Sequence, residues 1–235
     1  MANQTHGSLA AEAAAYLRES AEAMEGGNGI EPEIRRQADC LLEWARKKNL
    51  ILTDSFTDGL EKFKSDTLEH VVYLRPSDRR VIKCTKPGRF GLAHGADGCY
   101  GRHVPATPLF YLRRIELSNR EFPTDLRLEG IALGKPDFGN KEELRPYIVT
   151  SQRLIEPIDV NCQNPSEEEI AASMMKLGFK LLPENVYNWV RESDGIVVTD
   201  ARMLNFILSD EGIIPIDLII AKYPTPAPAN RSPAI

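Results

Sequence analysis

The amino-acid sequence predicts an α+β fold with two lobes. Residues 1–52 show the apolar spacing of helices, and from residue 69 onward short apolar runs typical of strands take over. One helical stretch interrupts the first group of strands, and further helices and short strands follow. With 235 residues, 42% of them hydrophobic, the chain is long enough to bury a substantial core.

Two helices are predicted in residues 1–52. Residues 8–25 are rich in Ala and Glu, and the sequence GGNG at 26–29 ends this helix. The second helix has Pro32 near its start. Its apolar face comprises Ile34, Ala38, Leu41, Leu42 and Ala45. We expect the pair to be either a separate unit or a brace for the rest of the chain.

The first lobe is predicted to be a sheet with one inserted helix. HVVYLR (70–75) and RRVIKCTK (79–86) predict a hairpin around the turn PSD. A loop with five glycines follows, and then a helix over residues 108–122. The apolar residues of this helix are Leu109, Leu112, Ile115 and Phe122. Further strands are expected at 126–133 and 147–155.

The second lobe is predicted to begin with a helix over residues 165–182, capped by Ser166. A short helix is expected over 184–192. Three apolar runs separated by turns then predict strands. These strands are 195–200, 205–209 and 212–218. The tail contains four prolines and is expected to be flexible or extended.

Composition and charge exclude several classes of protein. The net charge of −5 argues against general binding of nucleic acid. No apolar run approaches the roughly 18–20 residues that span a bilayer, and the N-terminus lacks the pattern of a signal peptide. The four cysteines are far apart and are expected to be free thiols. We therefore expect a cytoplasmic protein without membrane attachment.

The sequence GIVVTDARMLNFILSDEGIIPIDLII carries the candidate chemistry. Asp200 and Asn205 have the spacing D-x-x-x-x-N, and Asp217 follows at the end of the next strand. Transfer of a phosphoryl group from Mg-ATP needs a carboxylate that orients the attacking hydroxyl, and an amide and a second carboxylate that hold Mg²⁺. The turn SDEG is expected to place Asn205 beside Asp217. The spacing alone is weak evidence, because DVNCQN has it too without flanking strands.

A lysine and a glutamate in the first lobe extend this pattern. Lys83 follows two β-branched residues, close to the V-A-I-K pattern of a phosphate-binding lysine. Its partner is expected on the following helix, where we prefer Glu116 to Glu121 because it lies nearer the middle. The segment IVTSQRLIEP falls where backbone groups would meet adenine, with Thr150 at its start. The residues expected to contact adenine are Gln152, Arg153 and Leu154.

Five blocks of sequence together resemble a known family. They are VIKCTKPGRFG, YLRRIELSNREF, RLEGIAL, YIVTSQRLIEP and GIVVTDARMLNFILSDEGIIPIDLI. In this order, over about residues 65–222, they are similar to the kinase-like domain found in polyvalent proteins of bacteriophages and conjugative elements. The resemblance implies a reduced two-lobed protein-kinase-like fold, a site for ATP and Mg²⁺, and a bacterial or host cytoplasm.

The sequence departs from the protein-kinase pattern in several places. Val-Thr stands where His-Arg would precede Asp200, and Leu-Ile follows Asp217 in place of Phe-Gly. Residues 63–74 contain no glycine, so the usual Gly-rich lid is absent, and the 18 residues after Asp217 predict a truncated C-lobe. The literal tripeptide Asp-Phe-Gly at 137–139 precedes the loop asparagine, so we interpret it as a coincidence in a turn.

The prediction is a kinase-like phosphotransferase of phage or mobile-element origin. Asp200 would orient the acceptor, Asn205 and Asp217 would bind Mg²⁺, and Lys83 with Glu116 would hold the α and β phosphates. The alternatives are a pseudokinase that acts as a nucleotide- or partner-binding module, and an effector that modifies a host target. A protein, a nucleotide or a small molecule remains open as the phosphoacceptor. The predicted domains are a helical extension at 1–52, a kinase-like domain at 53–223 and a Pro-rich tail at 224–235.

Three further groups of residues have a structural and a functional interpretation. The Gly-rich loop at 88–101 is expected to be a connector rather than a phosphate cradle. His94, Cys99 and His103 lack a fourth ligand nearby, so we do not expect a metal site there. The basic residues of the predicted hairpin are expected to form a solvated face rather than a docking site. They are Arg75, Arg79, Arg80, Lys83, Lys86 and Arg89.

Overall fold

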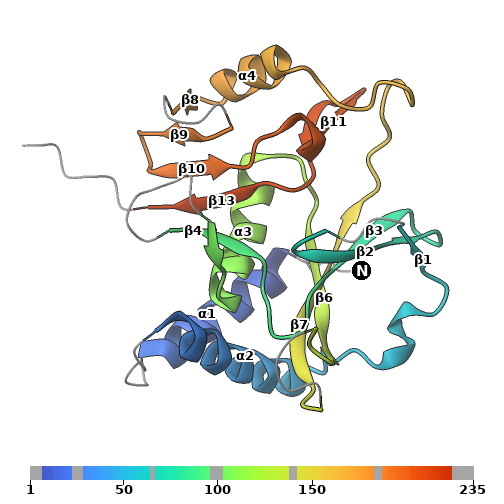
Figure 1. Cartoon of the computed structure of the whole chain (residues 1–235), viewed down its shortest axis with the longest axis vertical. Helices are drawn as coiled ribbons and strands as arrows, with labels where there is room; N and C mark the ends of the chain where they lie inside the picture. Colours follow the sequence, from blue (N-terminus) through green and yellow to red (C-terminus); the bar gives the residue numbers. More distant parts are fainter. Residues whose placement is uncertain are drawn as a thin grey trace, which may run out of the picture. The chain divides into compact units, whose positions relative to one another are not determined.

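The structure is a computed structural model that describes residues 7–22, 29–63, 67–95, 103–137, 142–182 and 187–223. The chain divides into two compact units, Met1–Glu156 and Pro157–Ile235. Figure 1 shows the helices and strands of each. Several sequence predictions concern positions outside the described residues, namely Phe138, Gly139, Cys99 and the tail at 224–235.

A five-stranded antiparallel sheet forms the centre of the first unit. Its strands are β1 (Glu61–Lys62), β2 (His70–Arg75), β3 (Arg80–Thr85), β6 (Arg127–Gly134) and β7 (Arg145–Arg153). The order in the sheet is β1-β2-β3-β7-β6, so β3 is the middle strand (Figure 1). The predicted hairpin is confirmed as β2 and β3, with Val72 opposite Lys83.

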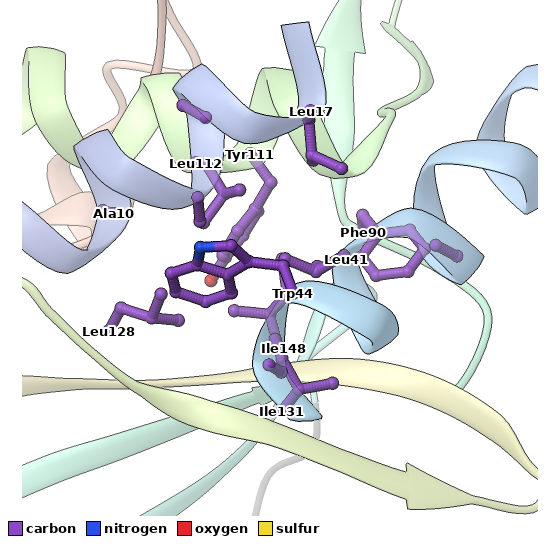
Figure 2. Close-up of a cluster of buried hydrophobic side chains, with 14 of the residues drawn as sticks. Ala10, Leu17, Leu41, Trp44, Phe90, Tyr111, Leu112, Leu128, Ile131 and Ile148 are labelled. Carbon is purple, nitrogen blue, oxygen red and sulfur yellow. The ribbon is translucent and has the colours of Figure 1, made fainter. Parts of the chain in front are cut away.

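Three helices pack on one face of this sheet. They are α1 (Gly7–Glu22), α2 (Ile30–Lys47) and α3 (Pro108–Glu121). Trp44 lies at the centre of the core that they share with the sheet, as Figure 2 shows. Other members of this core are Leu17, Leu41, Phe90, Leu112, Leu128, Ile131 and Ile148. The first two helices are therefore a brace for the sheet, one of the two arrangements that the sequence left open. The predicted domain boundary at residue 52 stays a prediction.

Local sequence explains where α3 begins and ends. Thr107 accepts a hydrogen bond from the Phe110 N–H at 3.2 Å, and Pro108 fits the first helical position. After the helix, the Asn119 side chain bonds both backbone groups of Leu126, at 2.7 and 2.8 Å, and so fixes the turn into β6. The predicted burial of Leu112 and Ile115 is confirmed.

The opposite face of the sheet has a smaller core. Ile82, Cys84 and Val149 are buried there under the segment that contains Leu52, Phe56 and Leu60. This segment includes the short 3-10 helix Asp54–Thr57. Burial raises the pKa of the Cys84 thiol to about 12, and the described cysteines Cys40, Cys84 and Cys162 are free, as predicted.

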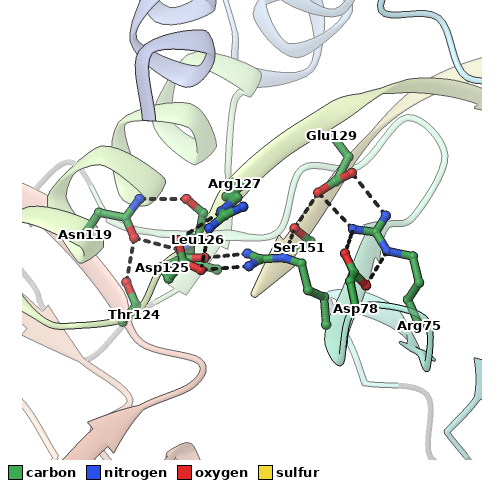
Figure 3. Close-up of polar contacts among 10 residues, drawn as sticks. Arg75, Asp78, Asn119, Thr124, Asp125, Leu126, Arg127, Glu129 and Ser151 are labelled. Atoms are coloured by element: carbon green, nitrogen blue, oxygen red, sulfur yellow. Dashed lines mark hydrogen bonds and ion pairs between the residues drawn. The ribbon is translucent and has the colours of Figure 1, made fainter. Parts of the chain in front are cut away.

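A network of ion pairs fastens the β2–β3 hairpin to its neighbours (Figure 3). Arg80 is buried, and its guanidinium donates to Asp125 at 2.7 Å and to the Ser151 hydroxyl at 2.8 Å. Arg75 forms ion pairs with Asp78 at 2.8 Å and Glu129 at 3.2 Å. The expectation of a solvated basic face on this hairpin is therefore wrong for Arg80, because its charge is satisfied inside the fold.

The second unit contains one helix and two small sheets. The helix α4 (Glu167–Lys176) begins at a capping box between Ser166 and Glu169, as the cap prediction required. The strands β8 (Lys180–Leu181), β9 (Trp189–Arg191), β10 (Ile196–Thr199) and β13 (Ile219–Lys222) form one antiparallel sheet. The strands β11 (Phe206–Ser209) and β12 (Gly212–Pro215) form a hairpin. Among the described residues of the chain, no helix has the length and apolar character to cross a membrane.

Three sequence predictions in this unit are wrong. The helix expected over 165–182 ends at Lys176, because Gly178 adopts a left-handed conformation with a φ of 81°, and Lys180–Leu181 is strand β8. The helix expected over 184–192 is not formed at Trp189–Arg191, which is strand β9, because its residues pair with β10 and the Trp189 ring is buried. The strand expected over 212–218 ends at Pro215, and Ile216 and Asp217 form a bend. For Trp189–Arg191, pairing with the neighbouring strand overrides the local helical pattern.

Candidate functional site

Asp200 and Asn205 are in direct contact in the second unit. They lie in the loop between β10 and β11, and Asn205 ends the 3-10 turn Met203–Asn205. The Asn205 Nδ2 donates to the backbone carbonyl of Asp200 at 2.7 Å and to its Oδ2 at 2.8 Å. The five-residue spacing thus closes a compact loop in which the amide holds the carboxylate.

The backbone and a second donor also fix the Asp200 side chain. Asp200 has a φ of 58°, in the left-handed region that few residues other than glycine adopt, although Asp tolerates it. The Arg202 Nε lies 2.8 Å from Oδ1, the carboxylate oxygen that Asn205 does not contact. The Arg202 guanidinium in turn lies over the Tyr187 ring, 5.6 Å from its centroid. Each oxygen of Asp200 therefore has its own donor, and these two contacts fix the orientation of the carboxylate.

Asp217 lies at the same end of the β11–β12 hairpin as Asn205. Phe206 pairs with Pro215, and the next backbone bond runs from the Ile216 N–H to the Asn205 carbonyl at 2.8 Å. Asp217 follows one residue beyond this bond and is half-buried. The backbone of Asp217 therefore begins one residue beyond a bond to Asn205, at the end of the hairpin where the SDEG turn was expected to place both residues.

Lys83 occupies the middle strand of the first unit and is only 9% exposed. An interpretation as an ordinary lysine of an edge strand is therefore wrong. Its neighbours Ile82 and Cys84 face the smaller core, so alternation along the strand directs Lys83 to the face covered by the helices. Thr150 is opposite Lys83 on β7, and its hydroxyl donates to the Lys83 carbonyl at 3.3 Å.

The three residues expected at the adenine differ in where their backbone groups point. The Leu154 N–H donates to the Arg79 carbonyl at 2.8 Å, toward β3. In an antiparallel pair the direction alternates, so the backbone groups of Gln152 also face β3 and those of Arg153 face the other edge. The ladder with β6 ends at the pair Arg127–Ser151, two residues before Arg153.

The two candidate partners of Lys83 lie on different sides of α3. Burial raises the pKa of the Glu116 carboxyl, against the opposing effect of Arg113 and of Arg18 on α1, so Glu116 faces toward α1. The Glu121 side chain is 9% exposed and pairs with Arg120 at 2.7 Å. Glu121 lies seven residues after Arg114, and this spacing places the two on one stripe of the helix.

In the described part of the Gly-rich loop, two backbone N–H groups form hydrogen bonds within the protein. The Gly88 N–H donates to the Pro146 carbonyl at 3.0 Å, and the Arg89 N–H donates to the Lys86 carbonyl at 2.8 Å. These bonds favour the interpretation of this stretch as a connector. Within the loop, β4 (Leu92–His94) and β5 (His103–Pro105) form a two-stranded ribbon.

The sequence predictions did not include Arg202, in the loop between β10 and β11, or Tyr187, over whose ring the Arg202 guanidinium lies. Arg202 was available as a basic residue two positions after a candidate catalytic carboxylate. Tyr187 could not be identified from the sequence, because only folding brings it to this loop. Its backbone carbonyl accepts a hydrogen bond from the Ala201 N–H at 3.0 Å.

Comparison with models of known protein families identifies a family over most of the chain. A model of the family described as serine/threonine/tyrosine kinase found in polyvalent proteins matches residues 35–222. The match includes α3, the five-stranded sheet and the whole Asp200–Asp217 segment. Searches of the curated proteins and of the solved structures found no match.

Proposed function

The chain belongs to the family of serine/threonine/tyrosine kinases found in polyvalent proteins, and on this premise we propose that it is a Mg-ATP-dependent phosphotransferase with a reduced two-lobed protein-kinase-like fold. The observation that carries the proposal is the Asp200 loop. An oriented carboxylate, an amide bonded to it and a further carboxylate at the same hairpin end are the groups that phosphoryl transfer from Mg-ATP requires.

In this proposal each residue of the second unit has one role. Asp200 accepts the proton of the acceptor hydroxyl and orients it for attack on the γ-phosphorus of ATP. Asn205 and Asp217 supply the amide and carboxylate oxygens that Mg²⁺ prefers. Arg202 positions Asp200 through the bond to Oδ1. Held by Asn205 and Asp217, Mg²⁺ would supply neutralisation of the charge on the phosphates.

Lys83 is proposed to hold the α and β phosphates. Protein kinases carry this lysine on the third strand, with its glutamate on the helix that follows. Lys83 lies on the third strand in chain order and on the face toward the helices, and both features support the assignment. Adenine is proposed to bond backbone groups of the segment Gln152–Leu154, which directly follows the central part of β7.

The geometry of α3 favours Glu121 over Glu116 as the partner of Lys83. Arg114, on the same stripe as Glu121, is paired with Glu69 at the start of β2. Asp125, four residues after Glu121, is bonded to Arg80 on β3, three residues before Lys83. Both contacts support placing the Glu121 side of α3 toward β2 and β3, whereas Glu116 faces toward Arg18.

The replacement Glu121→Gln is expected to raise the Kd for Mg-ATP about tenfold, because a hydrogen bond to a charged group contributes about 1.5–3 kcal/mol. Glu116→Gln makes the same chemical change on the other side of the helix and is expected to leave the Kd within about twofold. Isothermal titration calorimetry of both variants measures this. The reverse ranking would restore Glu116 as the partner.

Incubation with γ-labelled ATP tests the proposed function directly. Transfer of label to a protein or small molecule, lost in Asp200→Ala, supports an enzyme. A thermal shift with Mg-ATP but no transfer supports the alternative, a nucleotide-binding pseudokinase. The absence of glycine from residues 63–74 is the observation that favours this alternative.

The acceptor is proposed to be a hydroxyl on a protein segment with basic and apolar residues. Residues 157–235 contain 11 acidic and 6 basic residues, which accounts for the whole net charge of −5. Met203 and Leu204, in the Asp200 loop, are 42% and 75% exposed. Basic peptides are therefore expected to be phosphorylated faster than acidic ones of equal length, a difference that 1 M salt removes. Origin from a phage or mobile element and a cytoplasmic location remain proposals.

A further inference from the structure

Four apolar side chains are exposed in and beside the Asp200 loop. Met203 and Leu204, in the loop itself, are 42% and 75% exposed. Ile158 and Val160, in the loop of residues 157–164 that precedes α4, are 65% and 72% exposed. Among the described residues, three of the four most exposed large apolar side chains belong to this set. Single exposed apolar residues are common, but a group of them marks a surface for interaction.

Hydrogen bonds fasten the loop of residues 157–164 alongside β11 (Figure 1). The Ile158 N–H donates to the Leu208 carbonyl at 3.0 Å, and the Leu208 N–H donates to the Gln163 carbonyl at 2.9 Å. Nearer the Asp200 loop, the Asn164 Nδ2 donates to the Met203 carbonyl at 3.2 Å. The exposed residues of the two segments therefore adjoin each other on the surface of the second unit.

The loop of residues 157–164 is also held in shape by its own side chains. Asp159 Oδ1 accepts a hydrogen bond from the Asn161 N–H at 2.8 Å. The Gln163 Nε2 donates to the Val160 carbonyl at 3.1 Å. Ile158 and Val160 are thus carried by a fixed backbone, so a partner that covers them has little loop entropy to overcome.

The charge around these apolar residues has one sign. Residues 157–175 contain four acidic residues and no lysine or arginine, and residues 203–209 contain no charged residue. The acidic residues, all exposed, are Asp159, Glu167, Glu168 and Glu169. Arg202, the basic residue of the Asp200 loop, is paired with Asp200 at 2.8 Å. A partner that covers the apolar residues is therefore expected to be basic.

We propose that this surface docks a basic segment of a partner protein, and that the segment carries the acceptor hydroxyl. The docking surface comprises Ile158, Val160, Met203 and Leu204. An apolar residue beside the hydroxyl contacts Met203 and Leu204, and a basic residue farther along pairs with Asp159. The inference rests on the proposed function, because it requires that the hydroxyl meets Asp200.

The length of β11 sets the spacing that the docked segment must have. The four residues of β11 separate the Met203 end of the docking surface from the Ile158 end. At about 3.3 Å per residue this is roughly 13 Å, so an extended segment places its basic residue about four or five residues from the hydroxyl.

The test of the charge contact is a series of serine peptides of equal length and composition. Each carries a leucine beside the serine and one arginine, which is moved step by step along the peptide. With Mg-ATP, the wild-type chain is expected to give the highest kcat/KM at a spacing of about four or five residues, by about fivefold, the upper range for an exposed charge pair. Asp159→Asn is expected to remove this preference.

The test of the apolar contact is the double replacement of Ile158 and Val160 by serine. It is expected to raise the KM for the best peptide about tenfold, since less apolar area is buried on docking, and to leave kcat within about twofold. The matched control is Met175→Ser. Met175 is an apolar residue of α4 in the same unit, 59% exposed, and its replacement is expected to change neither constant.

Three outcomes would overturn the inference, and they differ in meaning. Equal kcat/KM for every arginine position, in the wild type as in Asp159→Asn, would remove the docking site and leave the phosphotransferase. A lower Tm and a lower kcat with an unchanged KM in the double serine variant would make Ile158 and Val160 merely structural. A wild-type chain that transfers no phosphate from Mg-ATP to any acceptor would overturn the proposed function itself, and this inference with it.

Discussion

The replacement Asp217→Ala is expected to lower the rate of phosphate transfer at least about 10²–10³-fold, the effect of removing one preorganised electrostatic group from an active site. Asp217 stands at the hairpin end next to the Ile216–Asn205 backbone bond. Its loss would leave Asn205 as the remaining proposed Mg²⁺ ligand of this pair. The initial rate of ADP formation over a range of Mg²⁺ concentrations measures the effect, and the Mg²⁺ requirement should rise.

The matched control for this prediction is Asp210→Ala. Asp210 lies in the turn at the other end of the same hairpin, is exposed, and carries the same charge. Its replacement is expected to leave turnover within about twofold, since exposed charges more than a Debye length of about 8 Å from the reacting groups are screened. Equal rates for Asp217→Ala and the wild type would exclude Asp217 as a metal ligand.

The replacement Trp44→Ala is expected to lower the free energy of unfolding by about 3–5 kcal/mol, as removal of a large buried side chain does. Trp44 is 3% exposed and lies in the core shared by α1, α2, α3 and the sheet (Figure 2). The loss is expected to unfold the sheet of the first unit together with its helices. Urea denaturation followed by circular dichroism and by hydrogen exchange in β3 measures both consequences.

The control on the same helix is Glu43→Ala. Glu43 is exposed and pairs with Lys47 at 2.7 Å, a surface contact that contributes little to stability because solvent screens it. If Trp44→Ala melted α2 while exchange in β3 stayed slow, residues 1–52 would be an independent extension, as the predicted domain boundary has it.

Capping and turn signals in the local sequence predicted part of the fold, and the segment around Trp189 shows what helical periodicity leaves out. The capping box at Ser166 and Glu169 and the hairpin at β2 and β3 depend on residues close in the chain, and both were predicted. The helix expected around Trp189 failed because β10 pairs with this segment, and periodicity does not report pairing.

The same distinction applies to the candidate site. Spacing together with the strand-turn-strand pattern was enough to propose Asp200, Asn205 and Asp217 as one group, because the loop and hairpin that join them are short. The rotation of α3 was not predictable from position within the helix. The rotation depends on which side of α3 faces the sheet. The ion pair between Arg114 and Glu69 identifies that side, and it exists only in the folded chain.

The position of β3 in the sheet has a consequence for how the chain is synthesised. Its neighbour β2 precedes it directly, but its other neighbour, β7, begins at Arg145, 60 residues after β3 ends at Thr85. Until β7 leaves the ribosome, β3 presents an unpaired edge, and unpaired edges recruit other chains into aggregates. Expression fragments that end before Arg153 are therefore expected to accumulate in inclusion bodies, whereas fragments that extend beyond it close the sheet.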